Sequence, residues 1–297
     1  MSSLEAVEKE IARLIDEAAY DRVSELFATL SGGKRLRAKL ILKIAEESEE
    51  APLLGAVVEL IHAASLLHDD VIDEATLRRG KASVNATEGS KIAVMLGDIL
   101  YSKGFSELVR FDRIIAQTIA DSVTALSIGE MMDVAMSESF NDDEERYMRM
   151  LYLKTATLIE AAAKAAAILS GKDAARYALY GKNLGLSFQI MDDILDIVAD
   201  EQTLGKPAMN DFVEGKCTLP YIYLYRALDD TDKERLRALH KRPLSDADSA
   251  WIKERMQRHG SLEKARDMMR RLGEEAIAAV DDAPLQDIVK SMMERSY

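Results

Sequence analysis

The sequence contains few glycine, proline and cysteine residues, which are common in turn-rich or disulfide-linked proteins. It has only 15 glycines and 5 prolines in 297 residues, which disfavours collagen-like repeats, disorder and turn-rich all-β folds. The single cysteine, Cys217, excludes an intrachain disulfide and suits a reducing compartment. No apolar run approaches the ~20 residues that span a bilayer. Acidic residues occur throughout residues 1–18, unlike in a signal or transit peptide. We therefore expect a soluble, cytoplasmic protein.

The balance of charge excludes one class of partner. Asp and Glu number 52 against 39 Lys and Arg, which gives a net charge of −13. Nonspecific nucleic-acid binding depends on basic patches, so we expect no nucleic-acid partner. Hydrophobic residues make up 48% of the chain, which is enough for a sizeable core.

Helical periodicity runs through nearly the whole chain, and alternating strand patterns are absent. The apolar face of the first predicted helix consists of Leu4, Val7, Ile11, Leu14 and Ile15. Further helices are predicted over residues 38–48, 53–74, 91–110, 112–138, 142–170, 173–199, 216–229, 232–241, 246–259, 261–281 and 284–295. No Pro/Gly/Ser-rich linker divides the chain, so we predict one all-α domain over residues 1–297.

Two aspartate-rich segments with the pattern Asp-Asp-x-x-Asp stand apart from the general acidity. They contain Asp69, Asp70 and Asp73, and Asp192, Asp193 and Asp196. Residues four apart share a helix face, where like charges repel, and the apolar surroundings add a desolvation cost. Acidic residues on one helix are often only a solvated face, but two copies within apolar sequence favour a compensating cation. Oxygen-only ligands favour Mg²⁺ that also binds phosphate oxygens.

Basic residues lie where diphosphate binding would require them. The segment 32–37 places Lys34, Arg35 and Arg37 after a glycine pair, at the start of a predicted helix whose N–H groups also favour anions. The remaining candidates are Arg78, Arg79, Lys154, Lys206 and Lys216. Each alone could simply aid solubility, but together, around two metal-binding clusters, they predict a site for one or two diphosphates.

The ordered motifs of this chain resemble those of the trans-type isoprenyl diphosphate synthases. The motifs are GGKRLR (32–37), LLHDDVIDEATLRRG (66–80), KT (154–155), FQIMDDILD (188–196), LGK (204–206) and EGKCTLP (214–220). The resemblance covers most of the chain, without departure at the charged positions. It implies an all-α isoprenoid synthase bundle around a central apolar cavity between the two Asp-rich helices, assembled as a homodimer.

The resemblance also implies a reaction and a set of roles. The reaction would be the head-to-tail condensation of an allylic diphosphate with isopentenyl diphosphate, with about three Mg²⁺ ions per active site. The metal ligands would be Asp69, Asp73 and Asp192, supported by Asp70, Asp193 and Asp196. The allylic diphosphate would be bound by Arg78, Lys154 and Lys206. Isopentenyl diphosphate would be bound by Lys34, Arg37, His62 and Arg79. Thr155 and Gln189 would line the reacting carbons, and Lys216 would join the substrate-binding set.

Two histidines need separate interpretation. A lone histidine on an apolar helix is more often a core residue than a ligand, but His62 lies two turns before Asp69 on the same face. The family pattern places a diphosphate contact at that position, which favours binding. We interpret His68, next to Asp69, as structural or as a support for the metal ligands.

Product length in this family depends on the depth of the cavity beneath the first cluster. Short-chain members carry bulky aromatic residues just before it, whereas this chain has Ala64 and Ser65. We therefore expect a long-chain product, as in the octaprenyl diphosphate synthases that serve quinone side chains, with transient membrane contact for its release. The floor of the cavity would come from Met131, Met132 or Met136, or from residues near Leu40, although a methionine cluster is more often core.

Three alternatives remain. The first is a shorter-chain geranylgeranyl or farnesyl diphosphate synthase. The second is a terpene cyclase on the same bundle, which would have no use for the GGKRLR segment. The third is a non-catalytic subunit of a heteromeric synthase, which would be expected to lose its aspartate clusters.

Overall fold

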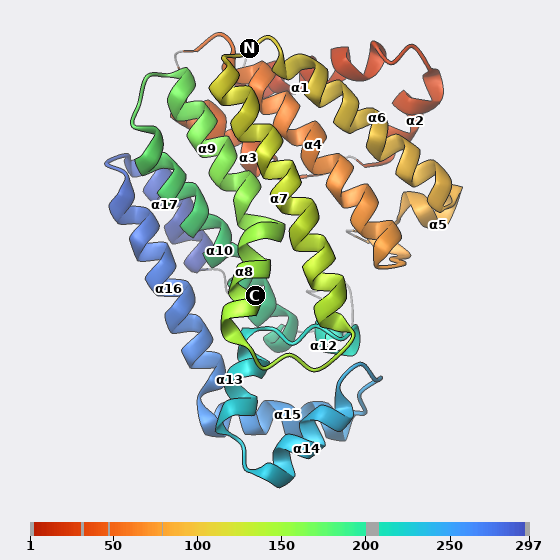
Figure 1. Ribbon diagram of the computed structural model, residues 1–297, viewed down its shortest axis with the longest axis vertical. Coiled ribbons are helices and arrows are strands. Elements are labelled where there is room, and N and C mark those ends of the chain that lie inside the picture. Colours follow the sequence, from red (N-terminus) through yellow and green to blue (C-terminus); the bar gives the residue numbers. More distant parts are fainter. Residues whose placement is uncertain (1–2, 31–32, 47, 79, 200–207, 295–297) are drawn as a thin grey trace. The chain divides into compact units, whose positions relative to one another are not determined.

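The computed structural model describes residues 3–30, 33–46, 48–78, 80–199 and 208–294, and these residues are predominantly helical (Figure 1). The chain divides into two compact units. One comprises residues 1–123 and 158–178, and the other comprises residues 124–157 and 179–297. The all-α class is confirmed, whereas the single domain over residues 1–297 stays a prediction.

The first unit is built around a long apolar helix, α4. Its elements before residue 109 are α1 (Ser3–Asp16), α2 (Asp21–Thr29), α3 (Leu36–Ile44), α4 (Ala51–Ile72), β1 (Leu77–Arg78), β2 (Lys81–Ala82), α5 (Val84–Glu88) and α6 (Ser90–Leu108). Pro52 lies in the first turn of α4, where its missing N–H costs nothing. Helix α4 packs against α1, α3 and most extensively α6, which lies beside it in Figure 1.

Helix α4 corrects one expectation from the sequence. Its 22 residues are long and apolar enough to cross a membrane, although we expected no run of such length. The structure explains this composition differently, because 67% of its most apolar window is buried inside the protein. It is therefore a core helix, as in a soluble protein.

The second unit has its own apolar core. Three helices have residues in both units, namely α7 (Arg113–Ser137), α9 (Thr157–Leu169) and α10 (Ala174–Val198). The other elements of the second unit are α8 (Glu144–Leu151), the π-helical turn η1 (Tyr152–Ala156), α12 (Asn210–Val213), α13 (Leu219–Ala227), α14 (Asp230–Leu239), α15 (Asp246–His259), α16 (Ser261–Ala279) and α17 (Ala283–Met293). In this core the rings of Phe212 and Tyr221 stack with centroids 4.3 Å apart. Side-chain caps from Asp143, Asp229 and Ser245 fix where α8, α14 and α15 begin.

The predicted long helices are confirmed within a few residues at each end, but several short features were missed. The expectation of no strands was wrong for the two-residue strands β1 and β2, which form an antiparallel hairpin. The single helix predicted over residues 142–170 is interrupted by η1. Helices α2, α5 and α12, of nine, five and four residues, were also missed, and short segments carry little periodicity.

Candidate active site

The first aspartate cluster lies at the carboxyl end of α4. Asp69 is half-buried, Asp70 is 3% exposed, and Asp73 is the exposed residue that ends the helix. Arg78 donates to Asp70 Oδ1 at 2.6 Å and forms an ion pair with it. Burial raises the pKa of Asp70, the positive charge of Arg78 opposes this, and Asp73 adds to it. The cluster thus combines one exposed, one half-buried and one buried carboxylate.

The hairpin after α4 places Arg78 against Asp70. Gly80 supplies the turn with a φ of +74°, a value that glycine adopts without strain. Asn85 then donates its side-chain N–H groups to the carbonyls of Asp70 and Ala75, both at 3.0 Å. These bonds fasten the hairpin to the end of α4. Arg79 lies outside the described residues.

A pocket of about 240 Å³ opens beside this cluster. Its polar and charged lining consists of Thr29, Arg35, Glu59, His62, Asp70, Arg78, Lys81 and Ser83. Two predicted diphosphate ligands, His62 and Arg78, are therefore brought to one pocket. Lys34 is exposed and Arg37 is half-buried, and within the described residues neither lines this pocket.

The second aspartate cluster lies within α10. Asp192 is half-buried, whereas Asp193 and Asp196 are only 4% and 3% exposed. The Tyr147 hydroxyl donates to Asp193 Oδ2, and Gln189 Nε2 donates to its Oδ1 at 3.1 Å. Burial and the nearby charge of Asp211 raise the pKa of Asp193 to about 8, against the lowering effect of those hydrogen bonds.

Burial divides the six aspartates into two groups. Asp73 is exposed and Asp69 and Asp192 are half-buried, and these are the three for which the family resemblance implies direct metal ligation. Asp70, Asp193 and Asp196 are buried and accept hydrogen bonds from within the protein. The individual roles remain predictions.

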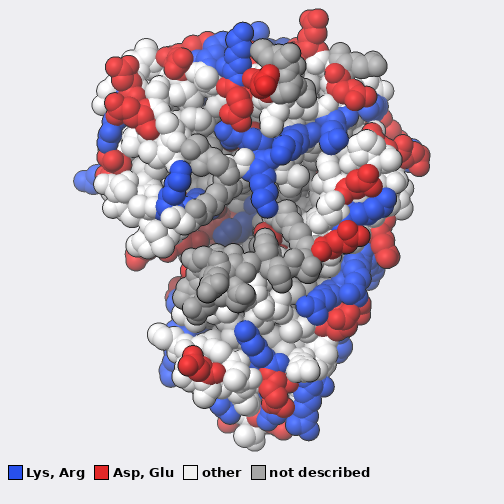
Figure 2. Space-filling view, turned by 180° about the vertical axis from the view of Figure 1, so that it is seen from behind, with Lys and Arg blue, Asp and Glu red and all other residues white. Residues whose placement is uncertain are grey.

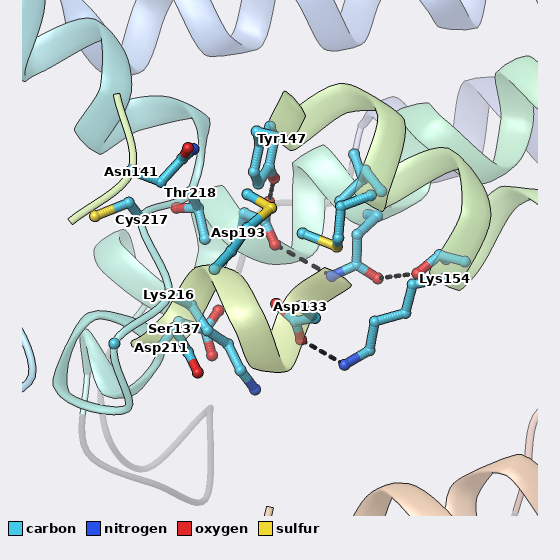
Figure 3. A pocket seen from close by; sticks show the side chains of 16 residues that line it. Asp133, Ser137, Asn141, Tyr147, Lys154, Asp193, Asp211, Lys216, Cys217 and Thr218 are labelled. Carbon is cyan, nitrogen blue, oxygen red and sulfur yellow. Dashed lines mark hydrogen bonds and ion pairs between the residues drawn. The ribbon is translucent and has the colours of Figure 1, made fainter. Parts of the chain in front are cut away.

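The π-helical turn presents Lys154 and Thr155. A Cβ added to Gly129 of α7 would lie 2.3 Å from the backbone nitrogen of Lys154, so glycine permits the close approach of α7. Lys154 Nζ forms an ion pair with Asp133 at 2.6 Å (Figure 3) and a second one with Glu130 at 2.9 Å. π-Helical turns occur frequently at functional sites, where they redirect side chains.

Hydrogen bonds link this turn to the second cluster. Thr155 Oγ1 donates to Gln189 Oε1 at 3.2 Å, and Gln189 in turn donates to Asp193. All three residues line a pocket of about 130 Å³, together with Lys154 (Figure 3). Lys216 lines the same pocket and pairs with Glu214 at 3.2 Å. Lys206, which was predicted to bind the allylic diphosphate with Arg78 and Lys154, lies outside the described residues.

Sequence reasoning missed the residues that hold this second site in place. They are Glu130, Asp133, Tyr147 and Asp211. Their partners lie between 15 and 46 positions away in the chain, so no local pattern marks them. The adjacency of Gly129 and Glu130 was visible in the sequence, but its meaning depends on the approach of η1.

The residues expected to control product length lie on the buried part of α4. Ala64 is fully buried, and Ser65 is 5% exposed and donates to the His62 carbonyl at 2.9 Å. Of the methionines considered for the cavity floor, Met136 is buried and lines the smaller pocket. Met131 is 73% exposed, so its assignment to the floor was wrong.

The structural interpretation of His68 is supported by its contacts. Its Nε2 lies 3.2 Å from the Val94 carbonyl oxygen and 3.5 Å from Asp98. A Cβ added to Gly97 would come within 2.3 Å of that nitrogen, so the ring fills space that a glycine of α6 leaves open.

The donor set fits a hard divalent cation. Within the described residues, no three His, Cys, Asp or Glu side chains converge on a preformed metal centre. Both clusters nevertheless offer accessible carboxylates beside buried ones whose pKa is raised by burial and neighbouring acids. A cation would relieve that excess negative charge, and Mg²⁺ commonly takes its remaining ligands from water and phosphate oxygens.

The acidic net charge does not leave the surface without cations. On the face shown in Figure 2, Lys and Arg side chains are interspersed with Asp and Glu side chains. Anion binding can be local, because the two pockets are lined by cations such as Arg78 and Lys154.

Comparison with known proteins agrees with this site chemistry. The family profile described as "Polyprenyl synthetase" matches residues 20–256. A short chain isoprenyl diphosphate synthase of Methanothermobacter thermautotrophicus is 37% identical, over 82% of this chain and 78% of its own. The crystal structure of octaprenyl pyrophosphate synthase from Helicobacter pylori has a TM-score of 0.94 and 41% identity, covering 99% of each chain. That of a Caulobacter crescentus polyprenyl synthase complexed with calcium and isoprenyl diphosphate has a TM-score of 0.89 and 30% identity, covering 100% of this chain and 95% of that one.

Proposed function

Because the chain belongs to the polyprenyl synthetase family, whose members are prenyltransferases, we propose that it condenses an allylic diphosphate with successive isopentenyl diphosphates. The family acts on isoprenyl diphosphates and uses a divalent metal, which we take to be Mg²⁺ here. The observation that carries the proposal is the presence of two complete aspartate clusters, each with accessible carboxylates and each beside a cationic side chain.

The chain's own residues supply most of the proposed mechanism. Bound Mg²⁺ would neutralise diphosphate charge and so favour departure of the leaving group. Lys154, held by Glu130 and Asp133, binds diphosphate oxygens and stabilises the charge that develops on them. Thr155 and Gln189, already joined by a hydrogen bond, orient the reacting carbons.

Apolar surroundings complete the proposed reaction site. The allylic carbocation is attacked by the isopentenyl double bond, and the proton then lost passes to the departed diphosphate. Apolar residues such as Met136, Met150 and Leu151 line the smaller pocket and limit the access of water to the cation. The reaction requires no nucleophilic side chain.

We propose a long-chain, all-trans product. The small side chains of Ala64 and Ser65 support it, as does the similarity to the Helicobacter pylori octaprenyl pyrophosphate synthase. The similarity to the Methanothermobacter enzyme favours the second candidate, a shorter-chain synthase. Sizing the products made from labelled isopentenyl diphosphate separates the two.

We also propose that the enzyme is a cytoplasmic homodimer. Apolar side chains stand uncovered on α6, where Ile92 and Met95 are 43% and 53% exposed. On the part of α7 in the second unit, Ile128 and Met131 are 45% and 73% exposed. Exposed apolar side chains gathered on a helix are typical of protein interfaces, so light scattering should give twice the chain mass.

The test of the proposed function is the loss of metal-dependent turnover. Asp69→Ala and Asp192→Ala should each lower Mg²⁺-dependent condensation by several orders of magnitude, because each removes an accessible carboxylate from one cluster. Glu263→Gln, at an exposed position of α16, is the control and should retain wild-type rates. Near-normal rates in either aspartate variant would refute the metal assignment.

A further inference from the structure

Glu59 is a buried carboxylate with no part in the mechanism above, yet it lines the same pocket as His62 and Arg78. It lies on α4 and is only 4% exposed. A negative charge in a pocket that binds a diphosphate is unfavourable unless another group offsets it. Its presence therefore calls for a physical explanation.

The contacts of Glu59 all lead to the segment that begins α3. The Ala38 N–H donates to Glu59 Oε1 at 3.1 Å, and Arg35 Nη1 lies 3.5 Å from its Oε2. Arg35 is also fixed from the other side, since it donates to both carboxylate oxygens of Glu8 on α1, at 2.7 and 3.1 Å. Arg35 is thus held between two carboxylates.

The contact between Glu59 and Ala38 caps the N-terminus of α3. Helix α3 begins at Leu36, and the residue before it, Arg35, has left-handed backbone angles (φ 50°, ψ 42°) without a side-chain cap. The first N–H groups of a helix need acceptors from outside the helical ladder. Glu59 supplies one for Ala38 from another helix, and so fixes the backbone that carries Lys34 and Arg37.

We propose that Glu59 is a positioning residue for the cationic segment Lys34–Arg37, and that Arg35 neutralises Glu59 instead of binding substrate. This inference rests on the proposed function and deepens it. Lys34 and Arg37 are assigned to isopentenyl diphosphate. The residues assigned to the allylic diphosphate include Arg78, which lines the same pocket but is held by Asp70, and Lys154, which is held by Glu130 and Asp133. Loss of Glu59 should therefore weaken capture of one substrate selectively.

The experiment compares KM for the two substrates in a matched set of variants. Glu59→Ala, which removes a buried charge-assisted hydrogen bond, should raise KM for isopentenyl diphosphate about tenfold and that for the allylic diphosphate less than about twofold. Glu59→Gln keeps an acceptor for Ala38, so the increase should be only about threefold. Glu8→Gln is the control, because it loosens Arg35 from outside the pocket and should leave both KM values within about twofold.

A charge-rescue pair distinguishes positioning from general stability. Arg35→Ala leaves the charge of Glu59 uncompensated and should raise KM for isopentenyl diphosphate. Combining Arg35→Ala with Glu59→Gln removes that charge, so it should reverse at least half of the increase in log KM. If Glu59→Ala does not fold, the inference is still tested by Glu59→Gln, Arg35→Ala and the double variant. An equal rise in both KM values, or no recovery in the double variant, would overturn the inference. Failure of the wild-type protein to condense the two diphosphates would instead refute the proposed function.

Discussion

Replacing Gly129 with alanine tests how closely α7 must approach the π-helical turn. The new Cβ would lie 2.3 Å from the backbone nitrogen of Lys154 and 2.7 Å from the carbonyl carbon of Leu153, roughly 1 Å inside ordinary contact distance. Both neighbours are backbone atoms, so no side-chain rotation can relieve the overlap.

The magnitude follows from two opposing effects. Alanine gains about 1 kcal/mol in helix propensity, whereas overpacking against fixed backbone costs about 3 kcal/mol or more. We therefore expect the free energy of unfolding of Gly129→Ala to fall by about 2 kcal/mol, measured by urea denaturation monitored with circular dichroism. The ammonium of Lys154 should also move, so kcat should fall at least about tenfold in the folded fraction.

Gly104→Ala provides the matched control. It is also a helical glycine, but its nearest neighbour would be the Cγ1 atom of the Ile61 side chain at 3.2 Å, which can adjust. Its unfolding free energy should stay within about 1 kcal/mol of wild type. Wild-type stability and kcat in Gly129→Ala would refute the claim that backbone contact positions Lys154.

Three further measurements test other parts of the structure. Tyr147→Phe removes a donor from the buried Asp193 and should lower the unfolding free energy by about 1–3 kcal/mol in urea, and unchanged stability would contradict that contact. Ala64→Phe should shorten the product to about fifteen or twenty carbons while turnover continues; an unchanged length by mass spectrometry would show that this position does not line the product channel. Burial raises the pKa of the Cys217 thiol to about 12, so at pH 8 only about one thiol in ten thousand is ionised. Iodoacetamide should therefore label it only after unfolding, and equal labelling rates in native and unfolded protein would contradict its burial.

The parts of the fold that sequence predicted are those whose signal is local. Long helices such as α4 and α10 repeat their apolar positions over several turns, so their presence and approximate ends could be predicted. The π-helical turn could not, and its close backbone contact is with Gly129, more than twenty positions away. The hairpin at β1 and β2 was equally invisible, since strands of two residues cannot show an alternating pattern.

For the candidate site, too, the features that could be predicted from the sequence are the local ones. Both Asp-Asp-x-x-Asp segments were evident from spacing and apolar context alone. The difference in burial among their members was not, because it arises from tertiary packing, which places Arg78 against Asp70 and Tyr147 with Gln189 against Asp193. Arg35 shows the converse, since the sequence groups it with two substrate-binding candidates while its contacts are with Glu8 and Glu59.

The two classes of aspartate should respond differently to natural variation. Asp70 and Asp193 are buried and accept internal hydrogen bonds. Most replacements at these positions should therefore reduce the amount of folded protein in a cell. Asp69 and Asp192 are accessible, and replacements there should leave abundance nearly intact while abolishing turnover. Both classes would look equally intolerant under selection for growth. A screen that measures abundance and turnover separately would show that folding constrains one class and chemistry the other.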